Sequence, residues 1–134
     1  MKSRTKVIVA AVALFIGASA FFGIRFLLSV QKYQAAVANT VLDHMDAQGL
    51  PDGAYVGEYD VGFVYAKVEV TVESGAIASI KLLEHRNDRG ADAERIVEEI
   101  VAQQRLDVDA ITGSTNSSTV IKKAVDNALF SARE

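Results

Sequence analysis

Residues 66–73 read Ala-Lys-Val-Glu-Val-Thr-Val-Glu, and this stretch decides the fold. Apolar and polar side chains alternate along it, and successive side chains of a strand point to opposite faces of its sheet. One face of this strand is therefore buried and the other faces water. Ser74 and Gly75 form a turn, and residues 76–83 return as a second strand. Residues 54–60 supply a third, so the sequence predicts an antiparallel three-stranded meander.

Two helices are expected after the sheet. Apolar side chains at three- and four-residue steps predict one helix over residues 93–104 and another over residues 120–129. The first helix turns Glu98 and Glu99 outward, where consecutive carboxylates do not form a catalytic pair. The second leaves the pair Lys122–Lys123 in solvent. The expected fold class is α+β, with a small antiparallel three-stranded sheet packed with helices.

A long apolar run precedes this domain. Residues 7–24 are eighteen uncharged residues, which as a helix span about 27 Å, close to the roughly 30 Å of a bilayer core. We expect one transmembrane helix in the cell membrane. The basic residues Lys2, Arg4 and Lys6 place its N-terminus in the cytoplasm and the domain on the extracytoplasmic side. A cleaved signal peptide is the competing interpretation, because residues 18–20 read Ala-Ser-Ala.

The chain therefore divides into three parts. Residues 1–30 are a cytoplasmic stub and transmembrane anchor, residues 31–50 a juxtamembrane helix, and residues 51–134 the domain. Gly49 and Pro51 end the juxtamembrane helix. Its prediction rests on an apolar stripe at helical spacing: Phe26, Val30, Tyr33, Val37, Val41 and Met45.

Composition excludes several kinds of chemistry. The chain has no Cys, which rules out disulfides, thiolate metal sites and iron–sulfur clusters. Its two histidines, His44 and His85, are too few for most metal or haem sites, so redox chemistry would need an organic cofactor. From residue 31 onward, ten basic and 17 acidic residues give a net charge of −7. An acidic domain argues against nucleic acid as a partner.

The stretch at residues 109–115 carries the candidate chemistry. It reads Asp-Ala-Ile-Thr-Gly-Ser-Thr and precedes the last predicted helix. Hydroxyl side chains and a glycine at a helix N-terminus, where N–H groups are unpaired, can hold a phosphate. Ser and Thr there can equally be ordinary N-caps. Gly113 would supply a turn conformation or a close backbone approach.

The same stretch resembles the flavinylation motif of the FMN-binding domain family, which runs Asp, two variable residues, Ser or Thr, Gly, Ala, Thr. Asp109, Thr112, Gly113 and Thr115 match, whereas Ser114 stands where the family usually has Ala.

The resemblance continues outside the motif and spans roughly residues 52–129. Residues 52–57, Asp-Gly-Ala-Tyr-Val-Gly, look like the opening of the family's domain, and residues 104–110 resemble the approach to its attachment loop. Residues 63–65 depart, reading Phe-Val-Tyr where Gly-Pro-Val is common.

The resemblance implies a cofactor and a function. In that family the last Thr of the motif carries FMN through a phosphoester made by a Mg-dependent flavin transferase from FAD. Here that residue is Thr115, with Asp109 either contacting the Mg²⁺ or the transferase, or bracing the loop. The implied function is electron transfer with a redox partner protein or a quinone system, as a carrier rather than a stand-alone enzyme. The alternative is a non-redox, membrane-anchored binding or assembly module whose loop only caps a helix.

Residues that contact the flavin ring are harder to assign. Tyr55, Tyr59, Phe63 and Tyr65 could stack on it, although strand aromatics more often pack in the core or pair across strands. His85 either faces the flavin or is a surface or capped histidine. The sequence offers no acid–base or nucleophilic constellation of its own.

Overall fold

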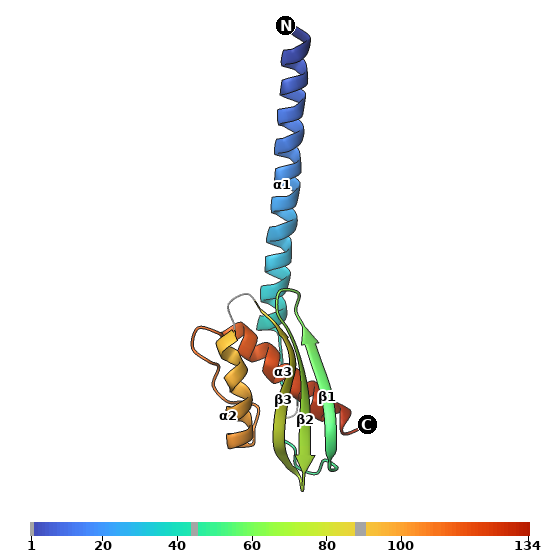
Figure 1. Cartoon of the computed structure of the whole chain (residues 1–134), viewed down its shortest axis with the longest axis vertical. Coiled ribbons are helices and arrows are strands. Elements are labelled where there is room, and N and C mark those ends of the chain that lie inside the picture. Colours follow the sequence, from blue (N-terminus) through green and yellow to red (C-terminus); the bar gives the residue numbers. More distant parts are fainter. Residues whose placement is uncertain (1, 44–45, 88–90) are drawn as a thin grey trace. The chain divides into compact units, whose positions relative to one another are not determined.

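A computed structural model describes residues 2–43, 46–87 and 91–134. It divides into two compact units, residues 1–35 and residues 36–134. The elements, in chain order, are α1 (Lys2–Ala38), β1 (Gly53–Asp60), β2 (Tyr65–Glu73), β3 (Ala76–Arg86), the 3₁₀ helix η1 (Ala91–Arg95), α2 (Ile96–Gln103) and α3 (Thr115–Ser131) (Figure 1). This is the α+β class predicted from the sequence.

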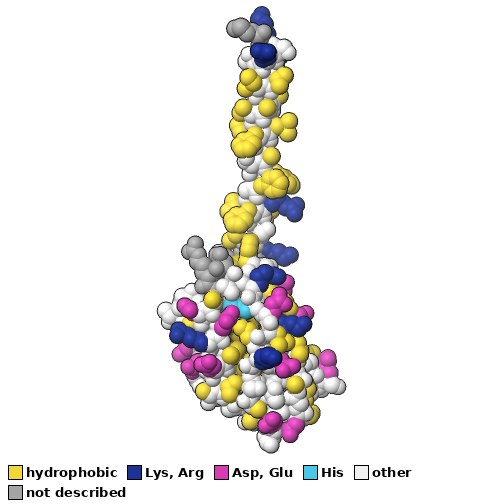
Figure 2. Space-filling model, viewed as in Figure 1, with side chains coloured by type: hydrophobic (Ala, Val, Ile, Leu, Met, Phe, Trp, Pro, Cys, Tyr) yellow, Lys and Arg dark blue, Asp and Glu magenta, His cyan; other side chains and the backbone are white. Residues whose placement is uncertain are grey.

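The first unit is formed by α1, whose last three residues, 36–38, belong to the second unit. No residue of α1 is buried, and its most apolar stretch has a mean hydropathy of 2.5. Figure 2 shows apolar side chains along the helix and Lys and Arg side chains at its N-terminal end. The helix is long and apolar enough to cross a bilayer, as predicted, and is consistent with a single-pass anchor.

The end of α1 corrects the predicted juxtamembrane helix. The helix stops at Ala38, so the prediction for residues 31–50 is wrong over residues 39–43 and 46–50. The Thr40 hydroxyl donates to the Ala36 carbonyl at 2.7 Å, competing with the next backbone hydrogen bond of the helix. The same hydroxyl is hydrogen-bonded to that of Tyr59 on β1 at 3.0 Å, so contacts with the domain, and not the apolar spacing, decide where the helix ends.

The segment after α1 is held by α3 instead of continuing as a helix. The backbone N–H of Asp43 donates to the buried carboxylate of Asp126 at 3.1 Å. Val41, which was expected in an apolar stripe, is exposed. His44 and Met45 lie outside the described residues.

The sheet is the predicted meander. Its strand order is β1-β2-β3, and both pairings are antiparallel. The alternation along β2 is confirmed, because its four apolar inward residues have no exposed surface: Ala66, Val68, Val70 and Val72.

β3 extends past its predicted end at Leu83 and reaches Arg86. Lys67 pairs with Glu84 and Val68 with Leu82, so Leu83 is the extra residue of a β-bulge. Beyond a bulge, each side chain of the strand lies on the opposite face of the sheet from the one that strict alternation would give. His85 consequently pairs with Ala66 and lies on the same face of the sheet as the buried residues of β2.

α3 covers that buried face and supplies the other half of the core (Figure 1). Its predicted stripe is fully buried: Val120, Ile121, Ala124, Val125, Ala128 and Leu129. Gly57 of β1 allows the close approach. A Cβ there would overlap the carbonyl oxygen of Ala124 and the backbone nitrogen of Ala128.

η1 and α2 lie along the β3 side of the sheet. Ala93, Ile96 and Ile100 are buried, as the predicted helix face requires. Gln104 ends α2 in the left-handed conformation, with φ 54°. Its side chain bonds both the N–H and the carbonyl of Ile77, each at 2.8 Å, which ties the end of α2 to β3.

The two lysines of α3 are not free in solvent, which corrects the sequence prediction. Lys122 donates to the carbonyl of Val108 at 2.9 Å, and burial lowers its pKa despite the nearby carboxylates. Lys123 is 15% exposed and donates to Asp126 at 2.6 Å and Asp43 at 2.9 Å. Burial acts to lower the pKa of Lys123, but these two carboxylates outweigh it and the net shift is upward.

Candidate functional site

The loop that precedes α3 closes in a tight turn. The N–H of Ser114 donates to the carbonyl of Ile111 at 2.9 Å, with Thr112 and Gly113 between them. Gly113 has φ +81°, the left-handed value that the third position of a type II turn requires. The glycine of the motif is therefore needed for the backbone conformation of this turn.

α3 itself fixes the loop at two points. The hydroxyl of Ser118, which has no exposed surface, accepts the N–H of Ile111 at 3.0 Å. One turn further along, Lys122 reaches the Val108 carbonyl. The loop is thus held against the helix that follows it.

Thr115 is the first residue of α3 and is exposed. The helix therefore begins inside the stretch that the sequence assigned to the loop. Ser114 occupies the N-cap position, but its side chain makes no capping hydrogen bond. The hydroxyl of Ser114 therefore takes none of the N–H groups of the first turn, and N–H groups at the start of a helix can bind an anion.

The carboxylates before the turn have different surroundings. Arg105 contacts both oxygens of Asp107, at 2.5 and 2.6 Å, and this pairing lowers the pKa of Asp107. Asp109 is exposed, and its carboxylate accepts no hydrogen bond from the residues that the structure describes. The backbone-bracing role considered for Asp109 is therefore not observed.

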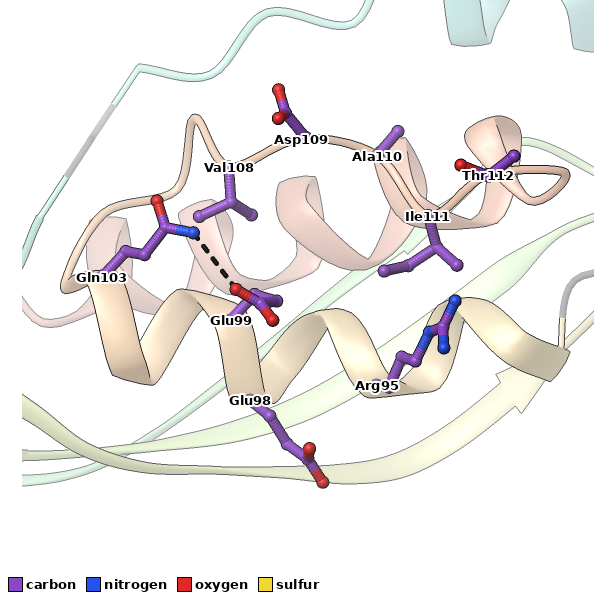
Figure 3. A pocket seen from close by; sticks show the side chains of 9 residues that line it. All are labelled: Arg95, Glu98, Glu99, Gln103, Val108, Asp109, Ala110, Ile111 and Thr112. Atoms are coloured by element: carbon purple, nitrogen blue, oxygen red, sulfur yellow. Dashed lines mark hydrogen bonds between the residues drawn. The ribbon is translucent and has the colours of Figure 1, made fainter.

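A groove of about 390 Å³ lies between α2 and the loop (Figure 3). In Figure 3 the side chain of Arg95 extends toward Ile111 and Thr112, and that of Glu98 points away from the loop. Glu99 accepts a hydrogen bond from Gln103 at 3.1 Å. The lining residues are Arg95, Glu98, Glu99, Gln103, Val108, Asp109, Ala110, Ile111 and Thr112.

His85 is neither on the surface nor isolated. Its side chain is 1% exposed. Nδ1 lies 3.1 Å from Oε1 of Glu94 in η1, and Nε2 lies 3.2 Å from Oγ of Ser117 in α3. Sequence reasoning missed this cluster because its members are 9 and 32 residues apart and share no local pattern.

The aromatic candidates have other roles, and none lines the groove. Tyr55 donates to the carbonyl of Pro51, and Tyr59 is hydrogen-bonded to Thr40. The hydroxyl of Tyr65 donates to Glu58 at 2.7 Å, which raises the pKa of Tyr65 to about 12. Phe63 is exposed in the turn between β1 and β2.

The fold and the loop define a small α+β domain that presents a threonine hydroxyl beside a helix N-terminus, a setting suited to a phosphorylated ligand. The sequence profile of the FMN-binding domain family matches residues 62–130, more than half of the chain, and the protein belongs to this family. No curated protein matches the sequence.

FMN is accordingly the cofactor, and the residues present fit it. Thr115 is accessible, Ser114 leaves the helix start uncapped, and the groove borders the same loop. Together with α1, the domain fits a membrane-anchored flavin-binding protein.

Proposed function

We propose that the protein carries FMN covalently on Thr115, through a phosphoester, and transfers electrons in a membrane-associated redox chain. The observation that carries this proposal is the position of Thr115: exposed, first in α3, and directly after a turn that the helix holds in place. The matching motif residues Asp109, Thr112 and Gly113 occupy that same loop and turn.

The attachment needs an external enzyme. A threonine hydroxyl is a weak nucleophile without an adjacent base. The ring nitrogens of His85 contact Glu94 and Ser117, and Lys122 is bonded to a backbone carbonyl. A Mg-dependent flavin transferase supplies the base and the metal. The Thr115 oxygen forms the new bond to the FMN phosphorus of FAD, the bond between the two phosphates breaks, and AMP leaves.

Asp109 is the chain's own contribution to that step. Its carboxylate is exposed and lies in the loop that leads to Thr115, so it can contact the Mg²⁺ or a polar group of the transferase. The paired Asp107 is less suited, because Arg105 already neutralises it. No other member of the motif carries a charge.

The groove offers a surface for the flavin ring. Val108 and Ile111 provide apolar contacts, whereas Arg95 and Gln103 provide hydrogen-bond donors for the polar edge of the ring. FMN accepts two electrons and releases them singly, which suits exchange between different partners. A quinone system or a redox partner protein near the membrane would supply and take the electrons.

A covalent link also suits an extracytoplasmic domain. A cofactor held only by equilibrium binding dissociates when its free concentration falls below Kd. The basic N-terminus of α1 and its apolar length support an orientation with the domain outside the cytoplasm.

Flavin retention after denaturation tests the proposal. The full-length chain, co-expressed with a flavin transferase and purified in detergent, should keep flavin fluorescence on a denaturing gel. Dithionite should bleach its flavin absorbance, and a water-soluble quinone should restore it. Thr115→Ala should lose the covalent flavin, while Thr119→Ala, a neighbouring hydroxyl variant, should keep it. A parent chain without flavin would favour the non-redox binding module.

A further inference from the structure

The buried His85 joins three elements that are distant in sequence. It lies on β3, and its side chain is 1% exposed. Its two ring nitrogens are hydrogen-bonded to Glu94 of η1 and to Ser117 of α3. Its pairing with Ala66 places it on the face of the sheet that α3 covers. A polar ring placed inside the domain is costly unless both nitrogens are satisfied.

The hydrogen-bonding partners of His85 indicate which ring nitrogen carries the proton. A carboxylate beside Nδ1 favours a proton on that nitrogen, since Glu94 can only accept when ionised. Nε2 is then an acceptor, and the Ser117 hydroxyl donates to it. The side-chain nitrogen of Asn87 lies 3.3 Å from the same Nδ1, but an amide nitrogen only donates, so it cannot bond to Nδ1 while that atom carries the proton shared with Glu94. The result is a chain of hydrogen bonds from η1 through His85 into α3.

That chain ends in the first turn of α3, two residues after Thr115. Ser117 is 3% exposed, and its neighbour Ser118 bonds the N–H of Ile111 on the loop side. Two consecutive serines therefore hold the same helical turn from two sides, one against β3 and η1 and the other against the loop. Thr115 is left exposed on a turn that is fixed on both sides.

We propose that His85 is a positioning residue for flavin attachment: by bridging Glu94 and Ser117, it holds the first turn of α3 so that Thr115 is presented to the transferase. This inference rests on the proposed function, because it concerns the same threonine. It assigns His85 no direct contact with the flavin.

The same three groups could be seen as an activated serine. A hydroxyl, an imidazole and a carboxylate in this order activate serine in hydrolases. Ser117, however, is enclosed within the domain, so a substrate cannot reach its oxygen. A positioning role fits this burial, whereas a nucleophilic role does not.

Hydrogen exchange of the full-length, flavin-free protein tests whether the bridge holds the turn. In Ser117→Ala and His85→Ala, the amides of residues 118–121, which the first backbone hydrogen bonds of α3 protect, should exchange at least tenfold faster, while those of central β2 stay protected. Glu94→Ala should show a smaller increase of the same kind. Glu94→Gln, which keeps an acceptor for Nδ1–H, should exchange like the parent.

A core variant controls for general destabilisation. Val72→Ala removes buried side-chain volume on β2 without touching the bridge, and its amides at residues 118–121 should keep their exchange rates relative to the rest of the domain. Unchanged local exchange in Ser117→Ala, which is the milder variant and less prone to misfold, would overturn the proposal. Labelling of Ser117 by a fluorophosphonate would overturn it as well.

The rate of FMN transfer tests the role in attachment. With purified transferase, FAD and Mg²⁺, Ser117→Ala and His85→Ala should be modified about tenfold more slowly than the parent, and Glu94→Gln and Val72→Ala at the parent rate. A parent that takes up no flavin would overturn the proposed function and this role with it. A parent modified no faster than Ser117→Ala would overturn the positioning role alone.

Discussion

The Ser118 hydroxyl accepts the backbone N–H of Ile111 at 3.0 Å, inside the domain and seven residues back along the chain. Ser118 has no exposed surface, and Ile111 is also buried. This one bond fixes where the turn at residues 111–114 begins relative to the helix that starts at Thr115. The loop conformation is therefore determined largely by α3.

Removing that hydroxyl should destabilise the domain. Ser118→Ala leaves the buried N–H of Ile111 without a partner, which costs about 1–3 kcal/mol in the free energy of unfolding. Thr119→Ala is the control, because the Thr119 hydroxyl donates to the Thr115 carbonyl at a more exposed position. This variant should change stability by about 0.5 kcal/mol or less. Urea unfolding of residues 36–134, followed by circular dichroism, measures both. Equal stability of the two variants would contradict the role of Ser118.

Close packing of β1 on α3 predicts a strong effect at Gly57. In Gly57→Ala the new Cβ meets backbone atoms of Ala124 and Ala128, which cannot move aside as a side-chain end could. We expect a loss of about 3 kcal/mol or more, at the upper end of overpacking effects. Gly53→Ala on the same strand meets the flexible end of Tyr55 and should cost less. Thermal unfolding that ranks the two variants in the opposite order would be inconsistent with this packing.

The buried charges on α3 predict a dependence on alkaline pH. The folded pKa of Lys123 is raised above its ordinary value of 10.5, because Asp126 and Asp43 outweigh the opposing effect of burial. The stability contributed by this lysine is therefore complete below pH 10.5 and is lost as pH rises through the folded pKa.

Lys123→Met should reveal this contribution. As pH rises above 10.5, the free energy of unfolding of Lys123→Met should fall less steeply than that of the parent. Lys81 is exposed, so the free energy of unfolding of Lys81→Met should fall as steeply as that of the parent. Denaturant unfolding at a series of pH values gives the slopes. A Lys123→Met slope as steep as the parent's would show that this lysine does not contribute.

The groove predicts a redox effect of Arg95. If the flavin ring lies there, the guanidinium stabilises the electron-rich reduced ring, and Arg95→Gln should lower the midpoint potential on the order of 20–50 mV. Arg133→Gln, an exposed arginine near the end of the chain, should leave the potential unchanged. A spectroelectrochemical titration of the flavinylated proteins measures the difference. Identical potentials in parent and Arg95→Gln would place the ring elsewhere.

Much of the fold could be predicted because its signals are local. The alternation along β2, the stripe of α3 and the uncharged run of α1 each follow from spacing that one element imposes on its own side chains. The prediction failed after Ala38, where helical spacing continued but Thr40 and Asp43 found other partners. Tertiary hydrogen bonds, which no local pattern records, decided that boundary.

Part of the candidate site could be predicted because its signals are also local, and the rest could not because it depends on tertiary contacts. The turn around Gly113 follows from residue type, and the motif identified the loop before α3. The start of α3 at Thr115, the burial of Ser117 and the partners of His85 depend on contacts across the domain. β3 carries bulges at Ala78 and Leu83, so the face of His85 follows from its pairing with Ala66 and not from alternation alone.

The most direct test of covalent attachment is the mass of one peptide. Trypsin releases residues 106–122, which contain the whole turn and the start of α3, from the full-length chain co-expressed with a flavin transferase. We predict that this peptide gains the mass of FMN minus water and that fragment ions place the gain on Thr115. Thr119→Ala, a hydroxyl variant in the same peptide but outside the motif, should keep the gain, and Thr115→Ala should lose it. No gain in the parent, or a gain retained in Thr115→Ala, would contradict the central claim.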